Sequence, residues 1–112
     1  METLSIESKE RLSLEAIAGI LSPRWRIETS PANTITVHGE KSRVYLHPDT
    51  QVTEHGMHRL LVDYSDVELA KKLVEIIADD PNLKVDNDFG TVLPGDQFVA
   101  RCRAERGWDW RR

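Results

Sequence analysis

The sequence predicts a single α+β domain over residues 1–112, in which helices pack on a mainly antiparallel sheet of four or five strands. Three short runs between residues 24 and 47 alternate apolar and polar side chains, a pattern typical of antiparallel strands with one covered face. Two other segments carry apolar residues at helical spacing. A chain of 112 residues is long enough for one core but not for two. The predicted element order is α-β-β-β-β-α-β-α.

The first predicted helix covers residues 8–21. Leu14, Ile17 and Leu21 recur at helical spacing, and Pro23 ends the helix because proline cannot continue the hydrogen-bond ladder. The alternating strands follow at residues 24–28, 34–38 and 43–47, and turn-forming segments separate them.

The segment from Met57 to Tyr64 contains three consecutive apolar residues, so we expect a strand near the centre of the sheet. Ser65 and Glu68 have the spacing of a capping box and predict the start of a second helix. In that helix Lys71 is expected to face water, and the segment 79–81 stops it. The apolar stripe is expected to comprise Val67, Ala70, Val74 and Ile77, widened by Leu73 and Ile76.

The C-terminal third contains a short strand around Leu83 and Val85 and then a polar turn at residues 86–90. Pro94 has a backbone angle suited to the first turn of a last helix, which Gly107 ends. The segment 108–110 carries two indoles, which we expect to fold back on the body because they are costly to leave in water.

Cys102 and the histidines are the residues best suited to catalysis or metal binding. Cys102 lies in the last predicted helix beside Phe98, which favours a core position over a catalytic nucleophile. His55 and His58 are the only close pair of histidines, and no second cluster or cysteine pair accompanies them. We therefore expect no enzyme activity, no metal and no cofactor.

Charge is unevenly distributed along the chain. Residues 63–96 contain nine acids and three lysines, a net charge of −6, whereas residues 97–112 contain five arginines and two acids, a net charge of +3. An acidic surface disfavours nucleic acid and favours a basic protein partner. We expect the C-terminal arginines to pair within the chain. One cysteine, no apolar run of about 20 residues and no signal-like segment at Met1 predict a cytoplasmic protein outside the membrane.

The acidic residues have two interpretations. Side chains in the segment 86–88 can bond their own backbone in a turn, and we favour this over a specific binding role; a calcium loop is excluded because its glycine and closing glutamate are missing. Five acids nevertheless make the first candidate partner-binding set, and a second candidate surface lies around Tyr45, His47 and Asp49. The first set comprises Asp79, Asp80, Asp86, Asp88 and Asp63.

Residues 85–102, VDNDFGTVLPGDQFVARC, together with the closing GWDW at 107–110, resemble the C-terminal part of immunity proteins from bacterial contact-dependent growth inhibition and related polymorphic toxin systems. The resemblance covers about a quarter of the chain, and residues 1–80 carry no motif of the family. It implies a cytosolic protein that binds and neutralises a cognate toxin domain, in many cases a nuclease with a basic channel. No catalytic residues are carried over, because the family has none.

The sequence therefore predicts a cytosolic immunity protein that inhibits a basic toxin domain by stoichiometric binding. One alternative is a small intracellular adaptor or regulatory domain. The other is a small hydrolase that uses Cys102 and a histidine.

Overall fold

A computed structural model covers residues 1–112 and confirms the α+β class. The observed order is β-α-β-β-β-β-α-β-β-α, and all seven strands belong to one sheet, more than the four or five expected. The elements are β1 (Glu2–Ser8), α1 (Leu14–Leu21), β2 (Arg26–Thr29), β3 (Ile35–His38), β4 (Arg43–Pro48), β5 (His58–Tyr64), α2 (Val67–Ile77), β6 (Lys84–Asp86), β7 (Val92–Pro94) and α3 (Gly95–Ala104).

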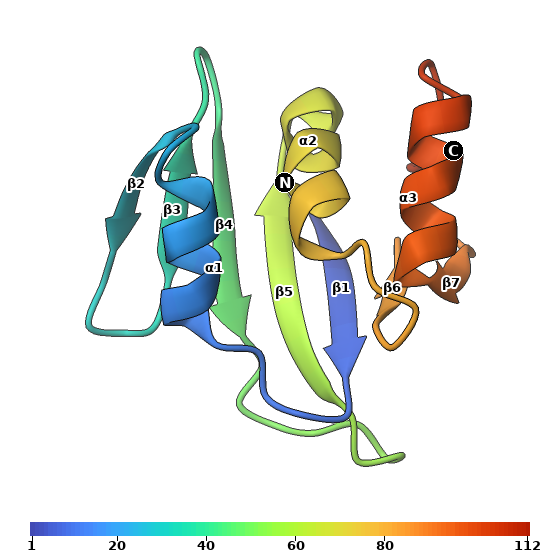
Figure 1. The fold of residues 1–112 in the computed structure, drawn as a ribbon, viewed down its shortest axis with the longest axis horizontal. Coiled ribbons are helices and arrows are strands. Elements are labelled where there is room, and N and C mark those ends of the chain that lie inside the picture. The colour runs from blue at the N-terminus through green and yellow to red at the C-terminus, as the bar shows by residue number, and fades with distance from the viewer.

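The sheet has the strand order β2-β3-β4-β5-β1-β6-β7, and each neighbouring pair is antiparallel (Figure 1). Strands β2 to β5 form a meander in chain order, as the alternating runs predict. Strand β1 then lies between β5 and β6 and joins the meander to the β6–β7 hairpin. Strand β5 is fourth of seven, which confirms its expected central position.

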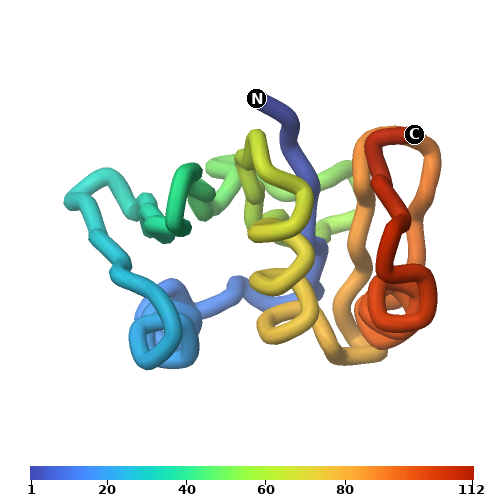
Figure 2. The backbone as a smooth tube through the Cα atoms, turned by 90° about the horizontal axis from the view of Figure 1, so that it is seen from above, coloured from blue at the N-terminus to red at the C-terminus, as the bar shows by residue number.

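All three helices cover the same face of the sheet (Figure 2). The core between them is one cluster of 23 buried residues, to which every strand except β2 and β7 contributes. None of the helices is long and apolar enough to cross a bilayer.

The first six residues of the helix predicted over 8–21 are strand or loop instead. Residues 2–8 form β1, with Leu4 and Ile6 fully buried, and α1 begins only at Leu14 after the Ser13 cap. The side chain of Ser13 accepts a hydrogen bond from the backbone N–H of Ala16 at 3.2 Å. The helix is shorter than expected because Ser8 pairs with His58 in the sheet and the cap that starts the helix is Ser13.

Helix α2 differs from its prediction at two residues. Its N-cap is Asp66 and not Ser65, because the carboxylate of Asp66 accepts hydrogen bonds from the backbone N–H groups of Glu68 and Leu69. Lys71 is buried and does not face water; its Nζ donates to the carbonyl oxygen of Arg106 at 3.1 Å. The ammonium group thus holds the C-terminal segment against α2.

The C-terminal segment folds back as expected. Trp110 is fully buried, contacts Tyr64 edge-on with ring centroids 5.6 Å apart, and donates its indole N–H to the Tyr64 hydroxyl. Phe98 lies against both Trp108 and Trp110. Pro94 caps α3, as predicted, but the helix ends at Ala104, before Gly107. Of the residues after α3, Trp110 is therefore part of the core, and Trp108 packs against it.

Gly95 packs so closely on the turn after α2 that a methyl group there would overlap the carbonyl oxygens of Ala78 and Asp80. We expect Gly95→Ala to destabilise the fold by about 1–3 kcal/mol, the usual cost of overpacking. Gly19, in α1, has open space around it, and Gly19→Ala should stabilise the fold by about 0.5–1 kcal/mol. Urea unfolding of both variants measures these changes, and equal effects would contradict the packing argument.

Candidate functional site

The face of the sheet opposite the helices carries the side chains of greatest functional interest. On β5, Leu60, Val62 and Tyr64 point into the core, so Arg59, Leu61 and Asp63 point to the other side. The same alternation operates on β1, β3, β4 and β6. We call the surface that these strands present the open face.

On the open face, the carboxylate of Asp63 is held by two neighbouring side chains. Its Oδ1 accepts a hydrogen bond from the Thr3 hydroxyl at 2.7 Å, and its Oδ2 lies 2.8 Å from Nε2 of His47. The side chains of His47 and Asp63 are 32% and 26% exposed, so both remain accessible. Tyr45 lies directly across from Asp63 in the register of β4 and β5. Three strands therefore fix one carboxylate beside an imidazole and a phenol.

A second ordered pair lies where β4 ends. The Arg59 guanidinium contacts Asp49 at 2.6 Å, and Asp49 also accepts a hydrogen bond from the backbone N–H of Gln51. The Gln51 hydrogen bond, followed by that of Arg59, lowers the pKa of Asp49 below its usual value, with a further contribution from His47. Asp49 is therefore ionised at neutral pH and holds Arg59 in place.

The strand register brings the two predicted surfaces together. Asp86 lies opposite Ser5, Ser5 opposite Leu61, and Leu61 opposite His47, so one row of the sheet runs from β6 to β4. Of the first candidate set, Asp63 and Asp86 thus share the open face with Tyr45 and His47 of the second candidate surface, and Asp49 borders it.

Asp79 and Asp80 lie elsewhere, at the end of α2 on the helix-covered side. Asp79 forms an ion pair with Arg103 at 3.3 Å, and Asp80 accepts a hydrogen bond from the backbone N–H of Asn82. Both carboxylates stabilise contacts within the chain.

The interpretation of residues 86–88 as a turn is confirmed. Asp86 accepts a hydrogen bond from the backbone N–H of Asp88, which has a left-handed φ of 65°. The expectation that side chains of this turn bond its backbone also holds for Asn87, which is 1% exposed and organises the turn. Its Oδ1 accepts from the N–H groups of Phe89 and Thr91, and its Nδ2 donates to the Trp110 carbonyl. Asn is a residue type whose side chain often accepts hydrogen bonds from backbone N–H groups within a turn, here that of Thr91 four residues later.

The C-terminal arginines pair within the chain, as predicted. Arg111 donates two side-chain hydrogen bonds to Asp109, and these bonds hold the pKa of that carboxyl well below its usual range. Arg101 stacks on the Trp108 ring at 3.8 Å and also contacts Glu105. The ion pairs Arg103–Asp79, Arg106–Glu75 and Arg112–Asp109 account for the rest. These charges therefore form no unpaired basic patch.

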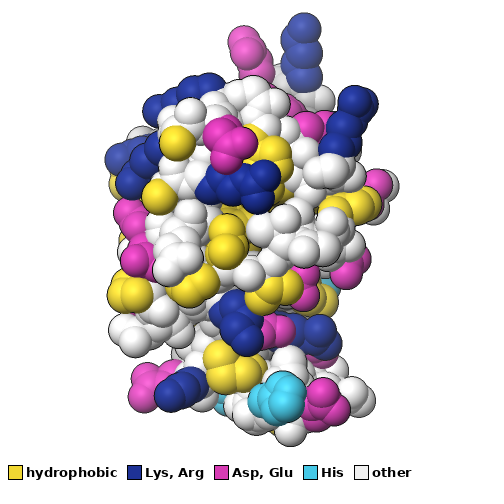
Figure 3. Space-filling model, turned by 90° about the vertical axis from the view of Figure 1, so that its right-hand side faces the viewer, with side chains coloured by type: hydrophobic (Ala, Val, Ile, Leu, Met, Phe, Trp, Pro, Cys, Tyr) yellow, Lys and Arg dark blue, Asp and Glu magenta, His cyan; other side chains and the backbone are white.

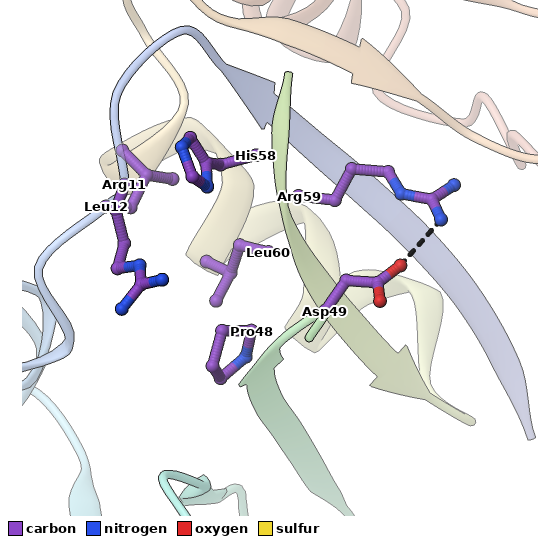
Figure 4. Close-up of a pocket in the computed structure, with 7 residues that line it drawn as sticks. All are labelled: Arg11, Leu12, Pro48, Asp49, His58, Arg59 and Leu60. Carbon is purple, nitrogen blue, oxygen red and sulfur yellow. Dashed lines mark hydrogen bonds and ion pairs between the residues drawn. The ribbon is translucent and has the colours of Figure 1, made fainter. Parts of the chain in front are cut away.

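The most enclosed cavity is small. It lies where the loop before α1 meets the start of β5, and its volume of about 20 Å³ holds one water molecule at most (Figure 4). Arg11 and His58 line one side of β5 there, while Arg59 and Asp49 lie on the other side. His55 is in the exposed loop that follows β4 and pairs with Glu54. No group of three potential ligands for a metal ion comes together.

Cys102 occupies the core position that the sequence favours. It is 1% exposed, and burial raises the pKa of its thiol to about 11. At neutral pH the thiol is therefore protonated and out of reach of a substrate.

Comparisons with protein-family models, with curated proteins and with solved structures found no match to this chain.

The raised pKa of Cys102 predicts how stability changes in alkali. An unfolded thiol ionises near pH 8.5, whereas the folded thiol keeps its proton up to about pH 11. Stability should be unaffected by the thiol below about pH 8 and should fall as pH rises toward 11, because the unfolded state loses its proton first. Urea unfolding at pH 7.5 and 10 should show a smaller loss for Cys102→Ala than for the native chain. Equal losses would place the thiol in contact with solvent.

Proposed function

We propose that this chain is a cytosolic immunity protein that binds a basic toxin domain through its open face and neutralises it by stoichiometric inhibition. The observation that carries the proposal is the fixed carboxylate of Asp63, held between Thr3 and His47 in the middle of an uncovered sheet face. The resemblance of residues 85–110 to immunity proteins supports the same conclusion.

The open face is suited to a flat protein surface. It carries the acids Asp63 and Asp86 and the cations Arg43, Arg59 and Lys84. Tyr45 and Leu61 add an aromatic and an aliphatic contact, with Thr3 and Ser5 as small polar neighbours. Aromatic side chains at the centre of an interface supply much of the affinity, whereas charges guide the encounter and set specificity. Because hydrogen bonds hold Asp63 in place before binding, its ordering costs little when a partner docks.

Inhibition requires no chemistry from this chain. A toxin that cleaves nucleic acid has a basic channel, and a surface bearing Asp63 and Asp86 can occupy such a channel where phosphates would lie. The net charge of −6 over residues 63–96 would speed association at low ionic strength.

The test uses the toxin domain of a large secreted protein that is encoded beside this chain, which we call the linked toxin domain. A catalytically inactive form of that domain is used for binding. We expect a one-to-one complex on size-exclusion chromatography with light scattering, and growth protection of cells that express the active toxin. We also expect an association rate that falls as salt rises. If no such gene lies beside this one, the adaptor becomes the better hypothesis. An association rate that does not change with salt would refute the claim that the acids attract the partner electrostatically.

Asp63→Asn tests the charge on the open face. The amide keeps an oxygen for Thr3 but removes the negative charge, so we expect about tenfold weaker binding of the linked toxin domain, or roughly 1.4 kcal/mol. Glu15→Gln is the matched control. Glu15 is an exposed acid on α1, on the side of the molecule away from the open face. Surface plasmon resonance at two salt concentrations measures both variants. Equal losses of affinity in the two variants would indicate that the net charge of the chain, and not the position of Asp63 on the open face, determines binding.

Cys102→Ala addresses the hydrolase alternative. The immunity proposal predicts that this variant protects cells fully, because the thiol is buried in the core. A complete loss of protection in a variant that remains folded by circular dichroism would favour the hydrolase.

A further inference from the structure

The β6–β7 turn, residues 87–91, exposes apolar side chains that the fold does not use. Phe89 is 43% exposed and Val92, at the start of β7, is 49% exposed. Phe89 is the only aromatic residue among the five large apolar side chains that lie open to solvent. The side of the molecule formed by β6, β7 and α3 carries separate apolar side chains bordered by charges of both signs (Figure 3). Aromatic side chains are enriched at protein interfaces relative to the rest of the surface.

The turn is rigid before any partner binds. Asn87 is buried and fixes the backbone on both sides of Phe89, through hydrogen bonds of 2.9 Å to the N–H groups of Phe89 and Thr91. It also donates to the carbonyl of Trp110 at 2.7 Å, which ties the turn to the core. The backbone that carries Phe89 is therefore fixed, so docking of the turn would cost little backbone conformational entropy.

The charges beside Phe89 define the chemistry of the partner. Asp86 and Asp88 flank the turn, and neither takes part in an ion pair within the chain. Asp49, Asp63, Asp79 and Asp109 are all paired. The turn thus offers one aromatic side chain and two uncompensated negative charges, which fit an apolar pocket with lysine or arginine at its rim.

We propose that Phe89 is the anchor of the partner interface: it inserts into an apolar pocket of a protein partner whose basic rim contacts Asp86 and Asp88. This inference rests on the proposed function, because it takes the partner to be the basic toxin domain. Asp86 lies opposite Ser5 and so belongs to the open face as well. The turn therefore adjoins the open face at Asp86, and the proposed interface takes its apolar contact from the turn and the Asp63 carboxylate from the face.

Phe89→Ala tests the anchor, and Ile20→Ala is its matched control because Ile20 is 49% exposed on α1. Isothermal titration with the inactive linked toxin domain should show a dissociation constant at least about 30-fold higher for Phe89→Ala, as expected for a hot-spot residue. Ile20→Ala should remain within about threefold of the native chain. Thermal unfolding should confirm that both variants are folded, since neither side chain is buried.

The double variant Asp86→Asn and Asp88→Asn tests the rim. Asparagine at 86 keeps an oxygen for the N–H of residue 88, and asparagine tolerates the left-handed φ of 65°, so the turn should persist without its charges. We expect the association rate to fall at least fivefold at low salt and to depend less steeply on salt than in the native chain.

The outcomes separate the inference from the proposed function. If the native chain binds tightly and Phe89→Ala binds equally well, the anchor is refuted while the proposed function stands. If the native chain does not bind the linked toxin domain, both fall. If Phe89→Ala only converts a dimer of this chain to a monomer and leaves toxin binding unchanged, the turn is a self-association site and the inference is overturned.

Discussion

The pairing of β1 with β5 on one side and β6 on the other is the constraint on which the rest of the structure depends. Seven residue pairs join β1 to β5, and three join β1 to β6. Without β1 the meander β2–β5 and the hairpin β6–β7 would be separate sheets, each too small to bury its apolar face. Because β1 alternates strictly, its pairing places Leu4 and Ile6 in the core and Thr3 and Ser5 on the open face.

The parts of the fold that follow local periodicity could be predicted from the sequence. The meander alternates every second residue, α2 has a wide apolar stripe, and Pro94 marks the start of α3, so these elements lie where expected. The alternation of Leu4, Ser5 and Ile6 is compatible with a strand, but it is short, and the residues that pair with β1 lie 50 to 81 positions further along the chain. Strand β7 is only three residues long and exists because β6 is beside it.

The candidate site was predictable in its residues but not in its arrangement. Asp63 and Asp86 belong to one candidate set and Tyr45 and His47 to the second candidate surface. Only the strand register shows that the two share one face. The importance of Asn87 was hidden because its partner, the Trp110 carbonyl, is 23 residues away. Lys71 was misplaced for a related reason, since a backbone carbonyl from a distant loop compensates its buried ammonium group. Long-range contacts account for each of these differences.

The central place of β1 also bears on how the chain reaches its native state during synthesis. Strand β1 precedes both of its neighbours in this sequence, since β5 follows at residues 58–64 and β6 at residues 84–86. Until β6 has followed, β1 paired with β5 leaves its other edge unpaired, and an unpaired strand edge is a template for association with other chains. Folding that depends on such non-local strand pairing is slow. Selection on this sequence would therefore act on the time for which a strand edge stays unpaired, as well as on the stability of the native fold.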